Sequence, residues 1–471
     1  MITGMTGLPT ILPWPGVKKC RTEPPAILPS VGWEPRRSTY WEMRNREVPK
    51  YKQLALKIPY GQGYLVGELP EGIRVQEVVP REIAGVPDPS ADVRRALEQP
   101  IGNHGVEELR GGRQVVIVVS DLTRPVPNDV ILPVLLEKLN AIGIKDEQVT
   151  ILVGTGLHRP APPEEFPLIV GPEVAARVKV ISHDAYAPGI LQQIGVSSRG
   201  TPIWINRHYL EADGRILIGM IDPHQFVGYT AGAKSLVIGC GGEATIRANH
   251  AHLVEPEATL GRIEGNPARE DIDEIGGLVG INLIINVILN SHKGIVRTVA
   301  GHYLAAHRAG VAVARQVSEV PVPALADVAI VSPGGFPKDI NLYQAQKGLA
   351  HGTRLVKEGG VIILCAECRE GVGEKRFIDT MQAGNTPEEV IKVFKQGEFQ
   401  MGRHKAFLWC RSLVRARVIL VSDGVDDNLA RIMMVRKAPD LQAAINMALK
   451  ELSGAGVVTV MPKANSTIPV F

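Results

Sequence analysis

Three basic side chains that could do chemistry lie in one glycine-rich stretch, residues 222–250, which reads DPHQFVGYTAGAKSLVIGCGGEATIRANH. His224 and His250 could act as bases or metal ligands, and Lys234 could act as a nucleophilic or cationic amine. Glycines there would let the backbone turn sharply or approach a ligand closely. A single histidine or lysine is more often structural or solvated, but this grouping favours a functional site.

Two other motifs, SDLTRP and GTGLHRP, also contain polar side chains that directly follow apolar runs. The first contains Asp121, Thr123 and Arg124, and the second contains His158. Arginine suits a carboxylate or a phosphate, because its planar fork binds two oxygens at once. His158 and His224 together could form an acid–base pair. Taken alone, SDLTRP could equally be a helix cap beside a surface arginine.

A third candidate group lies far along the chain in NLYQAQKG, where Tyr343, Gln344 and Lys347 occupy positions i, i+1 and i+4. In a helix, Tyr343 and Lys347 would share a face and Gln344 would neighbour Lys347. Such a face could hold a substrate anion, and a solvated helix face is the alternative. Three further histidines near predicted strand ends are expected to be structural or to support the site: His183, His252 and His292.

The apolar runs before these motifs predict a parallel sheet. Short apolar strands that alternate with helical segments are typical of βαβ units. Ligands bind beyond the carboxyl ends of the strands in such sheets, so we expect the motifs to share one site. The predicted strands cover residues 115–119, 149–153, 178–181, 216–221 and 281–289, and one helix is predicted at 130–142.

A second α/β region is predicted after the proline-containing segment EVPVPALAD, which is typical of a linker. We therefore expect two Rossmann-like α/β domains with mostly parallel sheets and an active site in the cleft between them. The second region has predicted strands at 328–331, 361–364, 418–421 and 457–460 and a helix at 441–452. The expected division is a Pro/Trp-rich N-terminal arm (1–50), an N-terminal α/β domain (51–315) and a C-terminal α/β domain (325–471), whose final residues can pack back on the first domain.

Composition is that of a soluble globular protein: 45% of the 471 residues are apolar and 21% are charged. A net charge of +3 gives no reason to expect nucleic acid or a membrane as a partner, and a homo-oligomer is compatible with the sequence. No apolar run approaches the roughly 20 residues of a membrane helix, and no signal peptide is recognisable. Five scattered cysteines favour reduced thiols and a cytoplasmic location.

Three common motifs are incomplete in this chain. GYTAGAKS nearly matches a nucleotide-binding P-loop, but Ala233 replaces the second glycine and DPHQFV separates the motif from the preceding strand. The glycines at 239, 241 and 242 do not form the dinucleotide fingerprint G-x-G-x-x-G. Cys365 and Cys368 form a C-x-x-C pair without the second pair that a zinc site needs. The N-terminal arm, with eight prolines and three tryptophans, is expected to pack on the body or on a neighbouring subunit.

Five motifs together resemble a known family, the nickel-dependent lactate racemases. SDLTRP, GTGLHRP, DPHQFVGYTAGAKS, IRANH and GGFPKDINLYQAQKG occur in the order and at intervals similar to those of the family, from about Tyr51 to the C-terminus. The family uses a nickel pincer nucleotide, a pyridinium mononucleotide whose two sulfur-containing arms grip nickel. The resemblance implies an isomerase that racemises or epimerises a 2-hydroxy carboxylic acid, lactate or a related acid.

The resemblance also implies a role for each matched residue. His158 and His224 would be the proton donor and acceptor. Lys234 would hold the cofactor, by a thioamide link where it is covalent, and His250 would ligate nickel. The residues implied to bind the cofactor are Asp121, Leu122, Thr123 and Arg124. The residues implied to bind or surround the substrate are Arg124, Tyr343, Gln344 and Lys347.

The implied mechanism avoids a difficult deprotonation, because the α-hydrogen of a 2-hydroxy carboxylate is a poor acid. Hydride would pass to the cofactor while one histidine takes the hydroxyl proton, which gives a planar 2-keto acid. Hydride would then return to the other face, and the second histidine would supply the proton. The cofactor carries the hard chemistry, and the protein orients the reactants and excludes water.

The chain departs from the family in two segments. GAKSLVIGCGG differs in its second half from the GxKSILPG form, and the tryptophan-bearing element that shapes the small-substrate pocket is replaced by FQMGRHKAFLW. Phe407 or Trp409 could substitute there. Two other hypotheses stay open: a Schiff-base enzyme in which Lys234 is the reactive amine, and a carrier that binds the cofactor without turnover.

Overall fold

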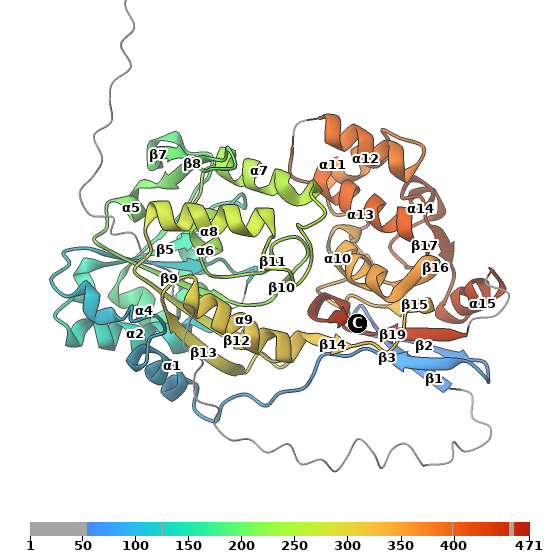
Figure 1. Cartoon of the computed structure of the whole chain (residues 1–471), viewed down its shortest axis with the longest axis horizontal. Helices are drawn as coiled ribbons and strands as arrows, with labels where there is room; N and C mark the ends of the chain where they lie inside the picture. The colour runs from blue at the N-terminus through green and yellow to red at the C-terminus, as the bar shows by residue number, and fades with distance from the viewer. Residues whose placement is uncertain (1–53, 125, 398, 452–455) are drawn as a thin grey trace, which may run out of the picture. The chain divides into compact units, whose positions relative to one another are not determined.

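The computed structural model describes residues 54–124, 126–397, 399–451 and 456–471, and its contacts gather residues 53–471 into one compact unit (Figure 1). The N-terminal arm and the packing expected of its tryptophans lie outside the described residues. Within the described part, no helix is long and apolar enough to cross a membrane. The four described cysteines form no disulfide, and all four are buried.

The first sheet has six strands in the order β13-β12-β9-β4-β5-β6. All neighbouring pairs are parallel except β12 with β13. From β4 the chain first adds β5 and β6 on one side and then β9, β12 and β13 on the other. The strand order therefore reverses between β4 and β9, which is where open α/β sheets bind ligands. The strands are β4 (Val115–Ser120), β5 (Val149–Gly154), β6 (Lys179–Ser182), β9 (Gly214–Met220), β12 (Leu283–Leu289) and β13 (Ile295–Gly301).

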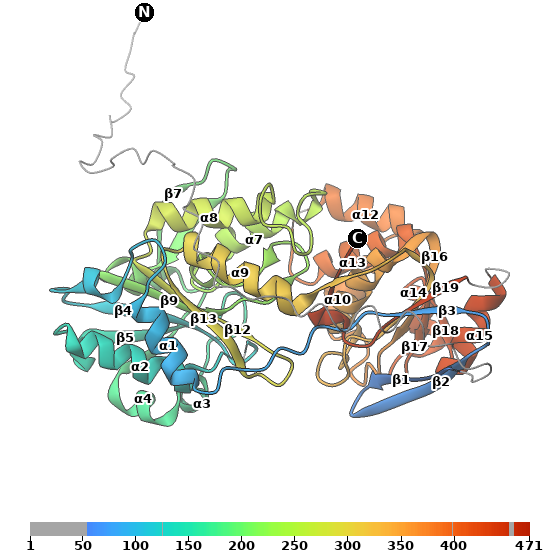
Figure 2. The same ribbon diagram turned by 60° about the horizontal axis from the view of Figure 1, so that its bottom comes forward.

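Helices cover both faces of this sheet, which explains why its strands are continuous apolar runs. Alternate residues of β4 enter different cores: Ile117 packs with one set of helices and Val118 with the other. In Figure 2 the first set lies on one side of the strands and the second on the opposite side. The first set includes α1 (Pro89–Glu98) and α2 (Asn128–Ala141), and the second includes α6 (Lys234–Val237) and α8 (Pro267–Val279).

The second sheet also has six strands, in the order β18-β17-β16-β15-β19-β3, and every neighbouring pair is parallel. The predicted architecture of two Rossmann-like α/β regions with mostly parallel sheets is therefore confirmed. The strands are β3 (Arg74–Glu77), β15 (Ala326–Val331), β16 (Val356–Cys365), β17 (Arg417–Val421), β18 (Arg436–Ala438) and β19 (Val457–Met461). Its helices include α10 (Leu342–Gly352), α13 (Arg403–Arg415) and α15 (Leu441–Glu451).

Two early segments, β3 and the hairpin before it, join the second region, which the sequence did not indicate. β3 pairs with β19, so this early strand completes the second sheet, and it is the blue strand among the red ones in Figure 1. The hairpin of β1 (Leu54–Tyr60) and β2 (Gly63–Leu69) packs against α15. Residues 54–77, which we predicted in the N-terminal domain, thus belong to the second region, β3 by strand pairing and the hairpin by its packing against α15.

The expected linker contains a strand as well. β14 (Glu319–Pro321) pairs in parallel with β20 (Ile468–Val470) near the C-terminus. Ile468 packs in a core with Ile221 and Tyr229, which belong to the first region. The last strand therefore returns to the first region.

Candidate active site

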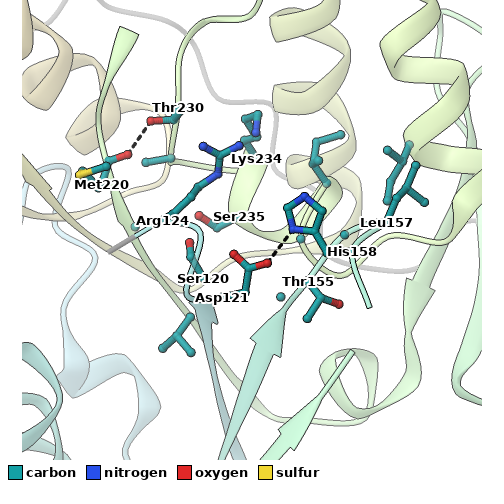
Figure 3. A pocket seen from close by; sticks show the side chains of 18 of the residues that line it. Ser120, Asp121, Arg124, Thr155, Leu157, His158, Met220, Thr230, Lys234 and Ser235 are labelled. Atoms are coloured by element: carbon teal, nitrogen blue, oxygen red, sulfur yellow. Dashed lines mark hydrogen bonds and ion pairs between the residues drawn. The ribbon is translucent and has the colours of Figure 1, made fainter. Parts of the chain in front are cut away.

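One pocket gathers the motifs that follow the strands of the first sheet (Figure 3). It lies beyond the carboxyl ends of β4, β5 and β9, at the reversal of strand order. Nearly all of its lining comes from the first α/β region, and Met401 is contributed by the second. Six residues singled out from the sequence line it: Asp121, Arg124, His158, His224, Lys234 and His250.

His158 is oriented by a carboxylate. Its Nδ1 lies 2.7 Å from Oδ2 of Asp121, the bond drawn as a dashed line in Figure 3. Asp121 also accepts hydrogen bonds from the Thr123 hydroxyl at 2.6 Å and from the Thr123 backbone N–H at 3.2 Å. Burial raises the pKa of the Asp121 carboxyl, but the hydrogen bonds from His158 and Thr123 outweigh it and hold the pKa below its usual value. An ionised Asp121 favours the Nδ1–H tautomer of His158, which leaves Nε2 free to accept a proton.

The resemblance implies that Leu122 and Thr123 bind the cofactor, but neither is among the residues that line the pocket. Thr123 supports Asp121 by its two hydrogen bonds, and the Leu122 side chain is 43% exposed. Asp121 and Arg124 are the two members of the motif that do line the pocket.

His224 is placed by a tight hairpin between β10 (Pro223–His224) and β11 (Gly228–Tyr229). Gly228 has φ +73°, and a Cβ there would lie 2.0 Å from the Arg262 carbonyl oxygen, so only glycine fits this turn. The Val227 backbone N–H donates to Nδ1 of His224 at 3.4 Å. This bond favours the tautomer that carries its proton on Nε2, the opposite of the His158 tautomer.

The surroundings of His224 keep its ring neutral. Burial is the main cause of a pKa well below the usual value, and the positive charges of Lys234 and Arg124 lower it further. The ring also packs edge-on against Phe226, with centroids 4.7 Å apart. His158 thus presents a nitrogen that can accept a proton, and His224 presents an N–H group.

Lys234 is the first residue of α6 and is only 7% exposed, whereas the sequence indicated a loop lysine. Within the described residues it makes no ion pair with a carboxylate. Burial lowers its pKa well below the usual value, and the nearby positive charges of Arg124 and Arg269 lower it further. A neutral amine is the nucleophilic form of lysine, so Lys234 is suited to covalent chemistry.

An unpredicted arginine holds the loop before Lys234 in place. Arg269, on α8, is 0% exposed and donates to the carbonyls of Tyr229 and Ala231 at 3.4 and 3.1 Å. It also forms an ion pair with Asp273 at 2.8 Å. The spacing of Arg269 and Asp273, four residues apart, was the signal that could have revealed this support.

We expect Arg269→Ala to destabilise the protein by about 1–3 kcal/mol, because it leaves the buried Tyr229 and Ala231 carbonyls without this donor, while Asp273 keeps its ion pair with Arg308. Chemical denaturation of the variant and the wild type measures this loss. Arg199→Ala is the matched control, because the ion pair of Arg199 with Glu270 is half-exposed and its removal should cost on the order of 0–1 kcal/mol. Equal losses in the two variants would contradict the role given to Arg269.

His250 lies near the end of α7 (Glu243–Ala251) and is 9% exposed. Its ring packs against Phe226 and Phe399, with centroids 5.1 and 6.0 Å away. Burial, with the charge of Lys234, lowers its pKa to about 3, so the ring is neutral and can donate a lone pair to a metal. Among the described residues no three His, Cys, Asp or Glu side chains are grouped to hold a metal.

The helix predicted around Tyr343 is confirmed as α10, but its three candidate residues do not line the pocket. Lys347 donates to Oε1 of Gln344 at 2.8 Å. Burial and the charge of Arg124 lower the pKa of Lys347 to about 8. Lys347 is also one of the positive groups that, after burial, lower the pKa of His224. Lys347 is therefore the member of the three that acts electrostatically on the pocket.

Two residues that the sequence analysis did not single out lie beside these α10 side chains. Lys405, on α13, is 2% exposed, donates to Gln346 at 3.0 Å and lies 4.7 Å from the centre of the Tyr343 ring. His404 is 4% exposed and stacks on Phe399, with ring centroids 5.8 Å apart. Phe399 in turn packs on His250, so α13 adjoins the wall of the pocket.

The expectation that Phe407 or Trp409 shapes the pocket is wrong. Phe407 is 3% exposed and packs in a hydrophobic core with Phe394. Trp409 is fully buried in the other core of α13, where its indole N–H donates to the Met433 carbonyl. An α-helix turns once every 3.6 residues, so different side chains face different neighbours. Phe407 and Trp409 face the two cores.

The three other histidines singled out from the sequence and the C-x-x-C pair lie outside the pocket lining. His183 is fully buried and bonded to the Gly241 carbonyl and the Asn206 amide, a structural role. His252 pairs with Glu255 at 2.7 Å, and the His292 side chain is 84% exposed. Burial raises the pKa of both Cys365 and Cys368 to about 12, which keeps their thiols protonated.

The chain forms two Rossmann-like sheets, and its pocket holds neutral histidine and lysine side chains beside an arginine. These features define a two-region α/β protein equipped for acid–base and covalent chemistry. Known proteins match it over most of its length. The family model of the lactate racemase N-terminal domain matches residues 60–261, and that of the lactate racemase C-terminal domain matches residues 322–469.

Two curated relatives carry the name lactate racemase. The protein from Thermoanaerobacterium thermosaccharolyticum is 33% identical over 423 residues, which cover 88% of this chain and 98% of the relative. The protein from Lactiplantibacillus plantarum is 35% identical over 380 residues, covering 79% and 88%. The chain therefore belongs to the lactate racemase family, a family of isomerases, and the resemblance seen in the motifs is confirmed.

Solved structures agree with this assignment. The lactate racemase apoprotein from Thermoanaerobacterium thermosaccharolyticum has a TM-score of 0.83 and 31% identity, covering 89% of this chain and all of that one. A protein from Thermotoga maritima has a TM-score of 0.62 at 18% identity, covering 83% of this chain, and shares the fold.

Proposed function

We propose that this protein racemises or epimerises a 2-hydroxy carboxylic acid, lactate or a related acid, with a nickel pincer nucleotide as its cofactor. The observation that carries the proposal is the pair His158 and His224, which present opposite tautomers to one pocket that also holds Lys234 and His250. A racemase needs a base and an acid on opposite faces of its substrate. The two relatives named lactate racemase support lactate as the substrate.

The charges of the pocket fit an anionic mononucleotide. Arg124 and Lys234 line it, and Lys347 acts on it electrostatically. Arg124 and Lys347 form no ion pair with a carboxylate in the described part of the chain, so their charges are available to phosphate and carboxylate groups. When bound, the cofactor supplies an acceptor and donor of hydride.

The metal donors of the site fit as well. His250 offers one neutral imidazole, and no cluster of three protein ligands stands beside it among the described residues. The remaining donors would have to belong to the organic cofactor. Lys234, as a neutral amine, could hold that cofactor covalently.

The substrate roles follow from charge and hydrogen bonding. Arg124 and Lys347 would bind the substrate carboxylate, with Gln344 holding the Lys347 ammonium in place. His158, oriented by Asp121, would accept the hydroxyl proton of one enantiomer, and His224 would supply the proton on the opposite face. For the other enantiomer the two histidines would exchange roles. Tyr343 would act through its contact with Lys405 rather than on the substrate.

Transfer of the α-hydrogen can be followed with deuterium. We expect a substrate deuterated at the α-carbon to react more slowly and to keep most of its deuterium in the racemised product, because a hydride never exchanges with water. A proton carried by a histidine would exchange during turnover. Mass spectrometry of the product distinguishes the two, and complete loss of deuterium to water would contradict hydride transfer. A carrier without turnover would leave the substrate enantiomer unchanged.

Nickel binding can be tested at His250. We expect His250→Ala to lower nickel retention by at least about 10-fold, because the variant loses the neutral imidazole of the site. Metal analysis after cofactor loading measures the retained nickel, and the thermal stability of the apoprotein should change far less. His252→Ala is the control, since His252 is engaged with Glu255. Unchanged nickel in the His250 variant, with a loss in the control, would move the ligand to His252.

The low pKa of Lys234 also favours the second candidate function, a Schiff-base enzyme, because such enzymes need a neutral amine. Borohydride treatment in the presence of a 2-keto acid would then attach the acid to Lys234. Under our proposal no such adduct forms, and loading with the nickel cofactor changes the mass instead. The assignment of cofactor binding to the N-terminal α/β domain, the cytoplasmic location and a homo-oligomeric state stay predictions.

A further inference from the structure

A second cavity, separate from the pocket described above, is lined by three arginines and no acidic residue. It has a volume of about 310 Å³ and shares no lining residue with the first pocket. One wall consists of Gln225, Pro256, Thr259 and Leu260 of the first region, and the other wall comes from α10, the residues that follow it, and α13. The arginines are Arg354, Arg411 and Arg415.

Most N–H groups of these arginines have no protein acceptor. Arg354 donates to the Leu260 carbonyl at 3.0 Å, and Arg415 donates to the Val356 carbonyl at 3.3 Å. Arg411 packs over the Phe407 ring and makes no hydrogen bond or ion pair within the described ranges. Each guanidinium has five donors and stays charged in proteins. The charges of Arg354 and Arg415 repel each other, and Glu319 offsets part of the charge of Arg354. None of the three guanidinium groups forms an ion pair with a carboxylate in the part of the chain that the structure describes.

Gln225 is a further polar group without a partner at the same cavity. Its side chain is 9% exposed, and its buried Oε1 has no hydrogen-bond partner. The unpaired atom is an acceptor, so a ligand that bonds to it must donate an O–H group, as hydrogen phosphate does through its P–OH and a small ester through an organic hydroxyl. Gln225 directly follows His224 in the chain, so the cavity wall includes the residue next to that candidate acid–base group.

We propose that this cavity binds a phosphate group, as inorganic phosphate or as a small phosphomonoester. A phosphate dianion compensates several guanidinium groups at once, and arginine forks match the spacing of its oxygens. The volume leaves room for the organic part of a small ester. A bound phosphate would join the Gln225 segment to α13 and would thereby restrain the chain next to His224. This inference does not depend on the proposed racemase activity.

Calorimetric titration of the full chain with inorganic phosphate tests the site, with chloride at matched ionic strength as the reference. We expect saturable binding that weakens at least about 10-fold in Arg411→Gln, the equivalent of one charge-assisted contact. Arg354→Gln is a second variant of the same cavity and should weaken binding in the same way. Arg124→Gln, which alters only the first pocket, should leave this binding intact. Melting curves of each variant verify that it is folded.

The other outcomes are equally informative. An absence of saturable binding in the wild type, or binding that persists in both cavity variants, would overturn the proposal. Loss of binding in Arg124→Gln alone would place the phosphate in the first pocket and would overturn it as well. Titration with glycerol phosphate separates the two sources: tighter binding than inorganic phosphate indicates an ester, and equal or weaker binding indicates the free ion.

Discussion

Replacing either His158 or His224 by alanine should reduce racemisation by about 10²–10⁴-fold in both directions. Each histidine is the base for one enantiomer and the acid for the other, so neither direction is spared. The double variant should be little worse than either single one, because residues that act as a unit are not additive. Initial rates from each enantiomer, measured after loading with cofactor, check this expectation.

Two further variants sharpen the test. Asp121→Asn keeps the shape of the side chain but removes the charge that orients the His158 ring, and its carboxylate lies 2.7 Å from that ring. We expect a large loss of rate, and the cofactor content of the variant, measured in parallel, separates this loss from any weakening of cofactor binding. His292→Ala is the control because the His292 side chain is 84% exposed and lies outside the pocket lining. A loss confined to one enantiomer in the His158 or His224 variants would contradict the paired roles.

Lys234→Ala should abolish covalent attachment of the cofactor and nearly all activity. Its side chain is 7% exposed and has no acidic partner among the described residues, so removal of the amine breaks no ion pair that stabilises the fold. Lys234→Arg is the matched variant, because it keeps a positive charge but lacks a neutral amine. Intact mass and nickel content after cofactor loading should show attachment in the wild type and in neither variant.

The possible outcomes distinguish covalent attachment of the cofactor to Lys234 from binding of the cofactor through the charge of this residue. Full activity in Lys234→Ala would show that the lysine is misassigned. Activity that is lost in the alanine variant but partly kept in the arginine variant would mean that Lys234 contributes charge rather than a covalent bond. Melting temperatures close to that of the wild type are needed for either conclusion.

The sequence predicted the first sheet closely because its strands are buried on both faces. Strands buried in this way are continuous apolar runs, so 115–119 and 149–153 were recognisable to within one residue of β4 and β5. The same reasoning placed the motifs at the carboxyl ends of parallel strands, and the pocket formed there. Local pattern and topology were sufficient for this part of the site.

Other features depend on contacts between distant segments, which a local pattern does not contain. β3 is four residues long, and its partner β19 lies more than 370 residues later. The role of Arg269 depends on which carbonyls face it, and the burial of Lys234 depends on the helices around α6. Phe407 and Trp409 were plausible by type, but the rotation of α13 directs them into the cores.

The pairing of β3 with β19 determines where the chain can be divided. A fragment cut before the second region would carry β1, β2 and β3 away from their partners, and the remaining fragment would expose the edge of β19. An unpaired edge strand is a template for aggregation. A stable second half would therefore have to carry residues 54–78 as a covalently fused or added peptide, even though these residues precede the first half in the chain.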